Sequence, residues 1–116
     1  MCSRTKQLNV AKQRVVAMQS VVLKDCILIW VGDHRRVDSL GFAFASRSAI
    51  LLDDAATMRA TFPVDSITST ISKLFPQKQV FFSTDLSTED NELWSDVVKG
   101  IAEDVASNKD FYGIAS

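Results

Sequence analysis

Three stretches of the chain place apolar residues at consecutive positions, and they limit most strongly the folds that it can adopt. The stretches are residues 27–31 (ILIWV), 40–45 (LGFAFA) and 80–82 (VFF). Their β-branched and aromatic residues favour strands, yet a strand with one solvated face alternates apolar and polar residues. We therefore expect a sheet that is buried on both faces. Helices can cover one face, and a large apolar patch on the other typically marks an interface.

The rest of the chain divides into further strands and two helices. Val-rich residues 14–23 predict a strand, and Lys24-Asp25 predicts a tight turn. Helical spacing follows Asp65 as far as Pro76, and a longer amphipathic helix extends to about Asn108. The predicted strands are residues 14–23, 26–32, 40–47, 49–53 (either a continuation of the third strand or a fourth) and 78–86.

The predicted order β-β-β(-β)-α-β-α indicates an α+β domain. We expect a mostly antiparallel sheet with two helices on one face, and the other face buried in a dimer. With 116 residues, the chain is expected to form a single domain, residues 1–116. Residues 1–24 hold five basic residues and no acid, and we expect residues 1–12 to be a flexible or loosely attached tail. A mitochondrial presequence has a similar composition.

The sequence offers little for catalysis or for binding a metal or cofactor. His34 is the one histidine, and the two cysteines show no short-range pairing pattern, so neither a disulfide scaffold nor a zinc site is expected. The four glycines are scattered, which excludes a phosphate-binding loop. The longest apolar run has six residues, whereas a membrane helix needs roughly 20. We therefore expect no enzymatic activity, cofactor, metal or membrane span.

Residues 41–44 (GFAF) resemble the aromatic strand with which an RNA-recognition motif stacks bases. Leu40, Ala45 and Arg47 do not fit the flanking positions of that pattern. An RNA-recognition motif has a second signature strand, and the candidate for it is the preceding predicted strand, residues 26–32. Only residues 33–39 separate the two strands, a length typical of a hairpin-like connection. The sequence pI of about 5.7 also disfavours binding to the phosphate backbone of a nucleic acid. RNA binding remains an alternative, and no nucleic-acid partner is expected.

Four motifs in order resemble the family of the fourth proteasome assembly chaperone, within the group of the third and fourth chaperones. They are LKDCILIWVG (23–32), LGFAFASR (40–47), STISKLF (69–75) and KQVFFSTDL (78–86). The similarity is collinear over residues 21–105. The loop 49–64 and the basic N-terminal residues do not match.

The resemblance implies a chaperone without enzymatic activity. A family member forms a heterodimer with the homologous third chaperone and binds alpha-type subunits while the alpha ring of the 20S proteasome assembles. The sheets of the two chaperones pack together with the helices outside. The resemblance also implies a cytoplasmic location, with the nucleus as an additional location left open. A small dimeric scaffold of the longin or roadblock type is a further alternative.

Two sets of residues are candidates for protein contacts. Aromatic residues dominate interface energetics, which selects four side chains on the predicted strands. A polar turn after the second predicted strand is the candidate contact for alpha-type subunits. The partner-interface candidates are Trp30, Phe42, Phe44 and Phe81, and the client-contact candidates are Asp33, His34, Arg35 and Arg36.

Overall fold

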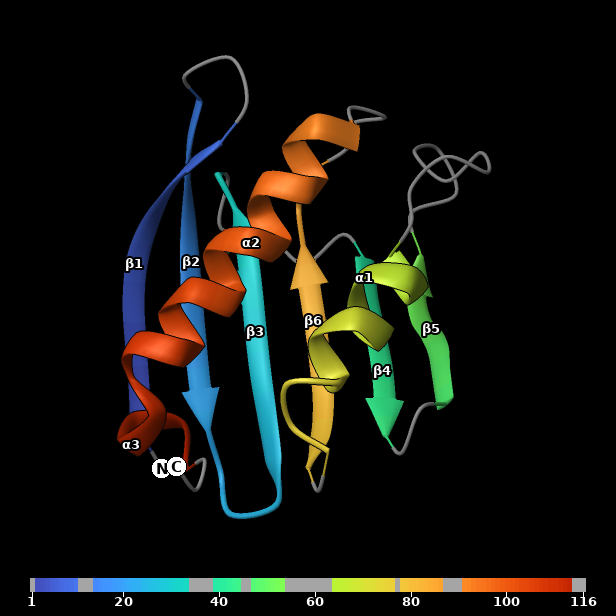
Figure 1. Cartoon of the computed structure of the whole chain (residues 1–116). Helices are drawn as coiled ribbons and strands as arrows, with labels where there is room; N and C mark the ends of the chain where they lie inside the picture. Colours follow the sequence, from blue (N-terminus) through green and yellow to red (C-terminus); the bar gives the residue numbers. More distant parts are fainter. Residues whose placement is uncertain are drawn as a thin grey trace.

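The computed structural model describes residues 2–10, 14–33, 39–44, 47–53, 64–76, 78–86 and 91–113. Within them the chain forms one six-stranded sheet and three helices (Figure 1). The predicted α+β class is confirmed. In chain order the elements are β1 (Cys2–Val10), β2 (Arg14–Val22), β3 (Cys26–Gly32), β4 (Ser39–Phe44), β5 (Arg47–Asp53), α1 (Val64–Ser72), β6 (Gln79–Thr84), α2 (Asn91–Ser107) and α3 (Lys109–Tyr112).

The sheet is mostly antiparallel, with strand order β1-β2-β3-β6-β4-β5. Only the β3–β6 pair is parallel among the strand pairs of the described residues. The hairpin-like connection predicted between β3 and β4 is wrong, because β6 lies between them. Phe81 of β6 is opposite Leu28 of β3 on one side and Phe42 of β4 on the other. A strand that is apolar at consecutive positions can occupy such a central place.

The prediction of a loosely attached tail at residues 1–12 is wrong for β1. All nine residues of this strand pair with β2, from Cys2 opposite Val22 to Val10 opposite Arg14. The strand has the alternation of a half-buried edge: Leu8 and Val10 are buried, whereas Gln7 and Asn9 are exposed. The N-terminal segment is therefore part of the sheet.

Residues 49–53 form part of a separate strand, β5, and do not continue β4. The two strands pair antiparallel, with Phe44 opposite Arg47. No strand or helix is expected from the sequence at residues 54–63, and they lie outside the described residues; Val64 begins α1. The α-helix expected as far as Phe75 ends at Ser72, and backbone bonds of the tighter i→i+3 type continue the turn to Phe75.

Helices α1 and α2 lie on the same face of the sheet (Figure 1). α2 packs on β1, while α1 packs on β4, β5 and β6. Their apolar stripes meet the inward residues of the strands and form the core. No helix in the described part of the chain is long and apolar enough to cross a membrane. The largest fully buried side chains are Tyr112, Phe82, Met18, Ile27, Ile29, Ile71, Ile101, Val16, Val31, Val80 and Val97.

Candidate partner-binding surface

The candidate site is the face of the sheet that points away from α1 and α2, which we call the open face. Alternate residues of each strand point to opposite faces, so the strand register identifies its members. None of the described helices lies on this face (Figure 1). Its described side chains are Ser3, Thr5, Gln7 and Asn9 of β1, Val15, Ala17, Gln19 and Val21 of β2, Cys26, Leu28 and Trp30 of β3, Phe42 and Phe44 of β4, and Gln79, Phe81 and Ser83 of β6.

Large apolar side chains form a row across the middle of the open face. Leu28, Phe81 and Phe42 are neighbours on β3, β6 and β4. The rings of Phe42 and Phe81 are 5.0 Å apart between centroids and tilted by 47°, a favourable geometry for an aromatic pair. Leu28 is 39% exposed and Phe44 is 42% exposed. Solvent therefore reaches a row of side chains that would gain free energy by burial.

All four residues predicted for the partner interface lie on the open face. Trp30, Phe42 and Phe81 are half-buried by their neighbours on the sheet, and Phe44 is exposed. The sequence left undecided whether these aromatics face the helices or the other side, because the strand register was not visible. Their contact with a partner remains a prediction.

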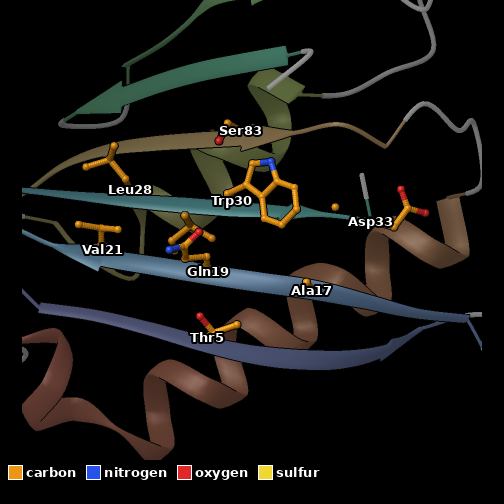
Figure 2. A pocket seen from close by; sticks show the side chains of 10 residues that line it. Thr5, Ala17, Gln19, Val21, Leu28, Trp30, Asp33 and Ser83 are labelled. Atoms are coloured by element: carbon orange, nitrogen blue, oxygen red, sulfur yellow. The ribbon is translucent and has the colours of Figure 1, made fainter. Parts of the chain in front are cut away.

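A hollow of about 760 Å³ lies beside the apolar row, over β1, β2 and β3 (Figure 2). Val21, Leu28 and Trp30 contribute its large apolar side chains. Small residues lie beyond Trp30 at the end of β3, where Ala17 of β2 is directly opposite Gly32. The hollow is therefore shaped in part by small residues at this end of β3, and it opens on the same side as the aromatic row.

The described side chains of the open face include no aspartate, glutamate, lysine or arginine. Polar groups on this face are neutral amides and hydroxyls, concentrated on β1 and at Gln19. Asp33 lies at the rim of the hollow, and its carboxylate forms an ion pair with Arg14. With its described side chains, the face is suited to an uncharged surface and offers no cation to a phosphate.

The turn predicted to contact a client begins at Asp33, directly after β3. The backbone N–H of Asp33 donates a hydrogen bond of 2.9 Å to Oδ1 of Asp85. His34, Arg35 and Arg36, the other three residues of that prediction, lie outside the described residues. Client contact by this turn therefore stays a prediction.

On the helix side of the sheet, a buried carboxylate joins the first strand to the second helix. Asp104 of α2 is 1% exposed and accepts a 2.9 Å hydrogen bond from Nη2 of Arg4 on β1. Nε of Arg4 also donates to this carboxylate, and Nζ of Lys6 lies 3.5 Å from its Oδ1. These charge-assisted contacts attach β1 to α2.

The same carboxylate also binds the C-terminal helix. The phenol of Tyr112 on α3 donates to Oδ2 of Asp104 at 2.6 Å, and its oxygen is 3.0 Å from Oγ of Ser20 on β2. Nδ2 of Asn108 donates to Oδ1 of Asp104 at 3.1 Å. Burial, together with the neighbouring carboxylate, raises the pKa of Tyr112, so the phenol remains a donor.

No pattern in the sequence predicted this polar cluster. Arg4 and Asp104 are 100 residues apart in the chain, and Asp104 interrupts the apolar stripe of a helix with no oppositely charged residue near it in the sequence pattern of that stripe. A buried position on an otherwise apolar helix face was the one available signal. No buried polar side-chain atom among the described residues lacks a hydrogen-bond partner, so we interpret this cluster as structural. The described residues also contain no group of ligand side chains that could hold a metal.

Comparison of the sequence with known protein families and with curated proteins finds no match. Comparison of the structure finds a chain from the crystal structure of a chaperone complex for yeast 20S proteasome assembly, with a TM-score of 0.58. The two chains share a fold. The likeness covers 97% of this chain and 99% of that chain, at 16% sequence identity. It is therefore a likeness of whole chains, in which the sheet and the helices both take part.

Proposed function

We propose that this protein is a non-enzymatic chaperone of 20S proteasome assembly. It pairs with a homologous chaperone through the open face and binds alpha-type subunits while the alpha ring forms. The single observation that carries the proposal is the likeness, over nearly the full length of both chains, to a chain of a yeast proteasome assembly chaperone complex. The four motifs that resemble the fourth proteasome assembly chaperone support the same function independently of the structure.

The open face supports the pairing with a second chaperone. Its central row of Leu28, Phe81 and Phe42 is apolar, and Phe44 beside it is 42% exposed. Burial of this row against a second sheet would contribute roughly 25 cal/mol for each Å² of apolar surface removed from water. Packing of sheet on sheet leaves the helices of both subunits outside, where α1 and α2 lie in this chain (Figure 1).

The RNA-binding alternative has one feature in its favour, the Phe42–Phe81 pair on the sheet surface. Binding of single-stranded RNA combines such stacking platforms with a basic groove that follows the backbone. The described side chains of the open face supply no lysine or arginine. The small-scaffold alternative differs from the chaperone in its partners, since it predicts a homodimer that does not bind proteasome subunits.

The proposal is tested by capture of the tagged protein from cell lysate, followed by mass spectrometry. We expect recovery of a homologous chaperone and of proteasome alpha-type subunits. A charge on the open face should release the chaperone, because a buried unpaired carboxylate is costly. Leu28→Glu introduces that charge at a position that is already 39% exposed, so the isolated fold should tolerate it.

Ser95→Glu is the matched control, because it adds the same charge at an exposed position of α2. This variant should recover both classes of partner as the wild type does. Thermal unfolding of both variants checks that the fold is retained. Capture of neither alpha-type subunits nor a homologous chaperone by the wild type contradicts the proposed function. Equal recovery of the chaperone by Leu28→Glu contradicts the use of the open face.

A further inference from the structure

Three residues meet closely where β3 ends: Trp30, Gly32 and Asp85. A Cβ atom placed on Gly32 would lie 2.6 Å from Cζ2 of the Trp30 indole and 2.2 Å from Oδ1 of Asp85. Both separations are far shorter than van der Waals contact between such atoms. The indole and the carboxylate therefore occupy the space that any side chain at position 32 would require. In Figure 2 the indole extends along β3 in the direction of Asp33.

Asp85 fixes this arrangement from the neighbouring strand. It follows β6 directly and is only 4% exposed. Its Oδ1 accepts the hydrogen bond from the Asp33 backbone at 2.9 Å and thereby joins the end of β6 to the end of β3. The next turn is held by Oγ1 of Thr84, which accepts a 3.0 Å hydrogen bond from the backbone of Leu86. The carboxylate is thus held by the Asp33 backbone, and the turn that carries Asp85 is held by Thr84.

The indole of Trp30 forms one wall of the hollow. In the register, Trp30 is opposite Gln19 of β2 and Ser83 of β6, while Gly32 is opposite Ala17. A side chain at position 32 would overlap both the indole and the Asp85 carboxylate. The observed orientation of Trp30 along β3 therefore requires glycine at position 32, with the Asp85 carboxylate beside it.

We propose that Gly32 and Asp85 are positioning residues, which hold the Trp30 indole along β3 as a rigid wall of the hollow that the partner chaperone contacts. The partner in this statement rests on the proposed function, whereas the orientation of the indole does not. A large aromatic side chain held in one orientation contacts a partner with little loss of conformational entropy on binding.

Fluorescence tests the orientation in the isolated chain. The chain has two tryptophans, so Trp94→Phe leaves Trp30 as the sole reporter. In that background, Gly32→Ala should move the emission of Trp30 to longer wavelength and increase its quenching by acrylamide, because the displaced indole enters solvent. Asp85→Ala should act in the same direction. Asp85→Asn keeps an acceptor oxygen and should restore most of the original emission, and Ser83→Ala is the control for a change beside the ring.

A second measurement separates displacement of the indole from a general loss of stability. Phenylalanine at position 30 lacks the Cζ2 atom that obstructs a side chain at position 32. Gly32→Ala should therefore lower the Tm less in a Trp30→Phe background than in the wild type, since the two sites are coupled. Equal shifts in the two backgrounds overturn the proposal.

A third experiment measures the affinity of each variant for the homologous chaperone that is recovered with the wild-type chain. Gly32→Ala should weaken this complex about tenfold or more, as displacement of an aromatic anchor does. Unchanged emission and quenching in Gly32→Ala overturn the proposal. A displaced indole with unchanged affinity also overturns it, and leaves the proposed function intact. If the wild type recovers no chaperone, the proposed function fails, and the claim of a partner contact fails with it.

Discussion

At the scale of single residues, Asp104 shows how a buried charge is retained in this fold. Burial raises the pKa of its carboxyl, but hydrogen bonds from Arg4 and Tyr112, with the charges of Arg4 and Lys6, outweigh burial. The pKa of Asp104 is therefore lower than its ordinary value, and the carboxylate stays ionised near neutral pH. Because the group is 1% exposed, loss of its charge disturbs three elements at once: β1, α2 and α3.

Asp104→Asn should lower the free energy of unfolding at pH 7 by about 1–3 kcal/mol, since it removes charge-assisted hydrogen bonds inside the fold. A carboxyl with a lowered pKa in the folded state contributes stability above its unfolded pKa of about 3.9, and loses it as the pH falls through the folded value. The difference between wild type and variant should therefore narrow below about pH 4.

Urea unfolding at a series of pH values measures this difference directly. Asp110→Asn on α3 is the control, because Asp110 is exposed. A difference between wild type and Asp104→Asn that stays constant down to pH 3 would contradict the assigned role of the charge.

Among the secondary-structure elements, β1 is the one whose attachment to the fold was predicted wrongly from the sequence. Its positive charges suggested a detached tail, but the acid that pairs with Arg4 and Lys6 lies on α2, far along the chain. α2 also comes close to β1 where a Cβ on Gly100 would be 3.0 Å from Cδ2 of Leu8. Apolar packing and ion pairing together hold this edge strand in place.

Leu8→Ala should therefore lower the free energy of unfolding by about 2–5 kcal/mol, the cost of removing a leucine side chain from a core. Leu8 is 3% exposed, so the cavity should form within the core under α2. Gln7→Ala, one residue away on the open face, should change stability by less than about 0.5 kcal/mol. Denaturant unfolding of both variants is the measurement, and an unaffected Leu8→Ala would indicate that β1 is detached in solution.

At the scale of the whole molecule, the two faces of the sheet differ in what covers them. α1 and α2 bury one face, while the open face presents neutral polar groups toward β1 and apolar groups over β3, β6 and β4 (Figure 1). Charged residues lie instead at the rim, as Asp33 and Arg14 do, or beneath the helices, as Asp104 does. A partner that binds the open face is expected to use apolar burial and neutral hydrogen bonds.

Affinity for the partner chaperone should depend little on salt. Raising salt from about 0.05 M to 0.2 M should change the Kd by no more than about twofold, whereas an RNA complex built on phosphate contacts would weaken about 10³-fold. Titration calorimetry of the purified pair at the two salt concentrations provides the test. Steep salt dependence would indicate that charged surfaces outside the open face carry the binding.

Local sequence patterns were enough to predict the types of most elements and to select the aromatic residues. Consecutive apolar residues indicated strands buried on both faces, and the spacing of three and four indicated the helices, because both patterns are local. Trp30, Phe42, Phe44 and Phe81 were selected together from such strands, and the structure places them on one face.

How these elements combine depends on contacts between distant parts of the chain. The insertion of β6 between β3 and β4, the pairing of β1 with β2, and the contact of Arg4 with Asp104 all join residues that no local pattern connects. A shift of one residue in register would turn every side chain of a strand to the other face. The open face could therefore be expected from the sequence, but its members were fixed by strand pairing and by the position of the helices.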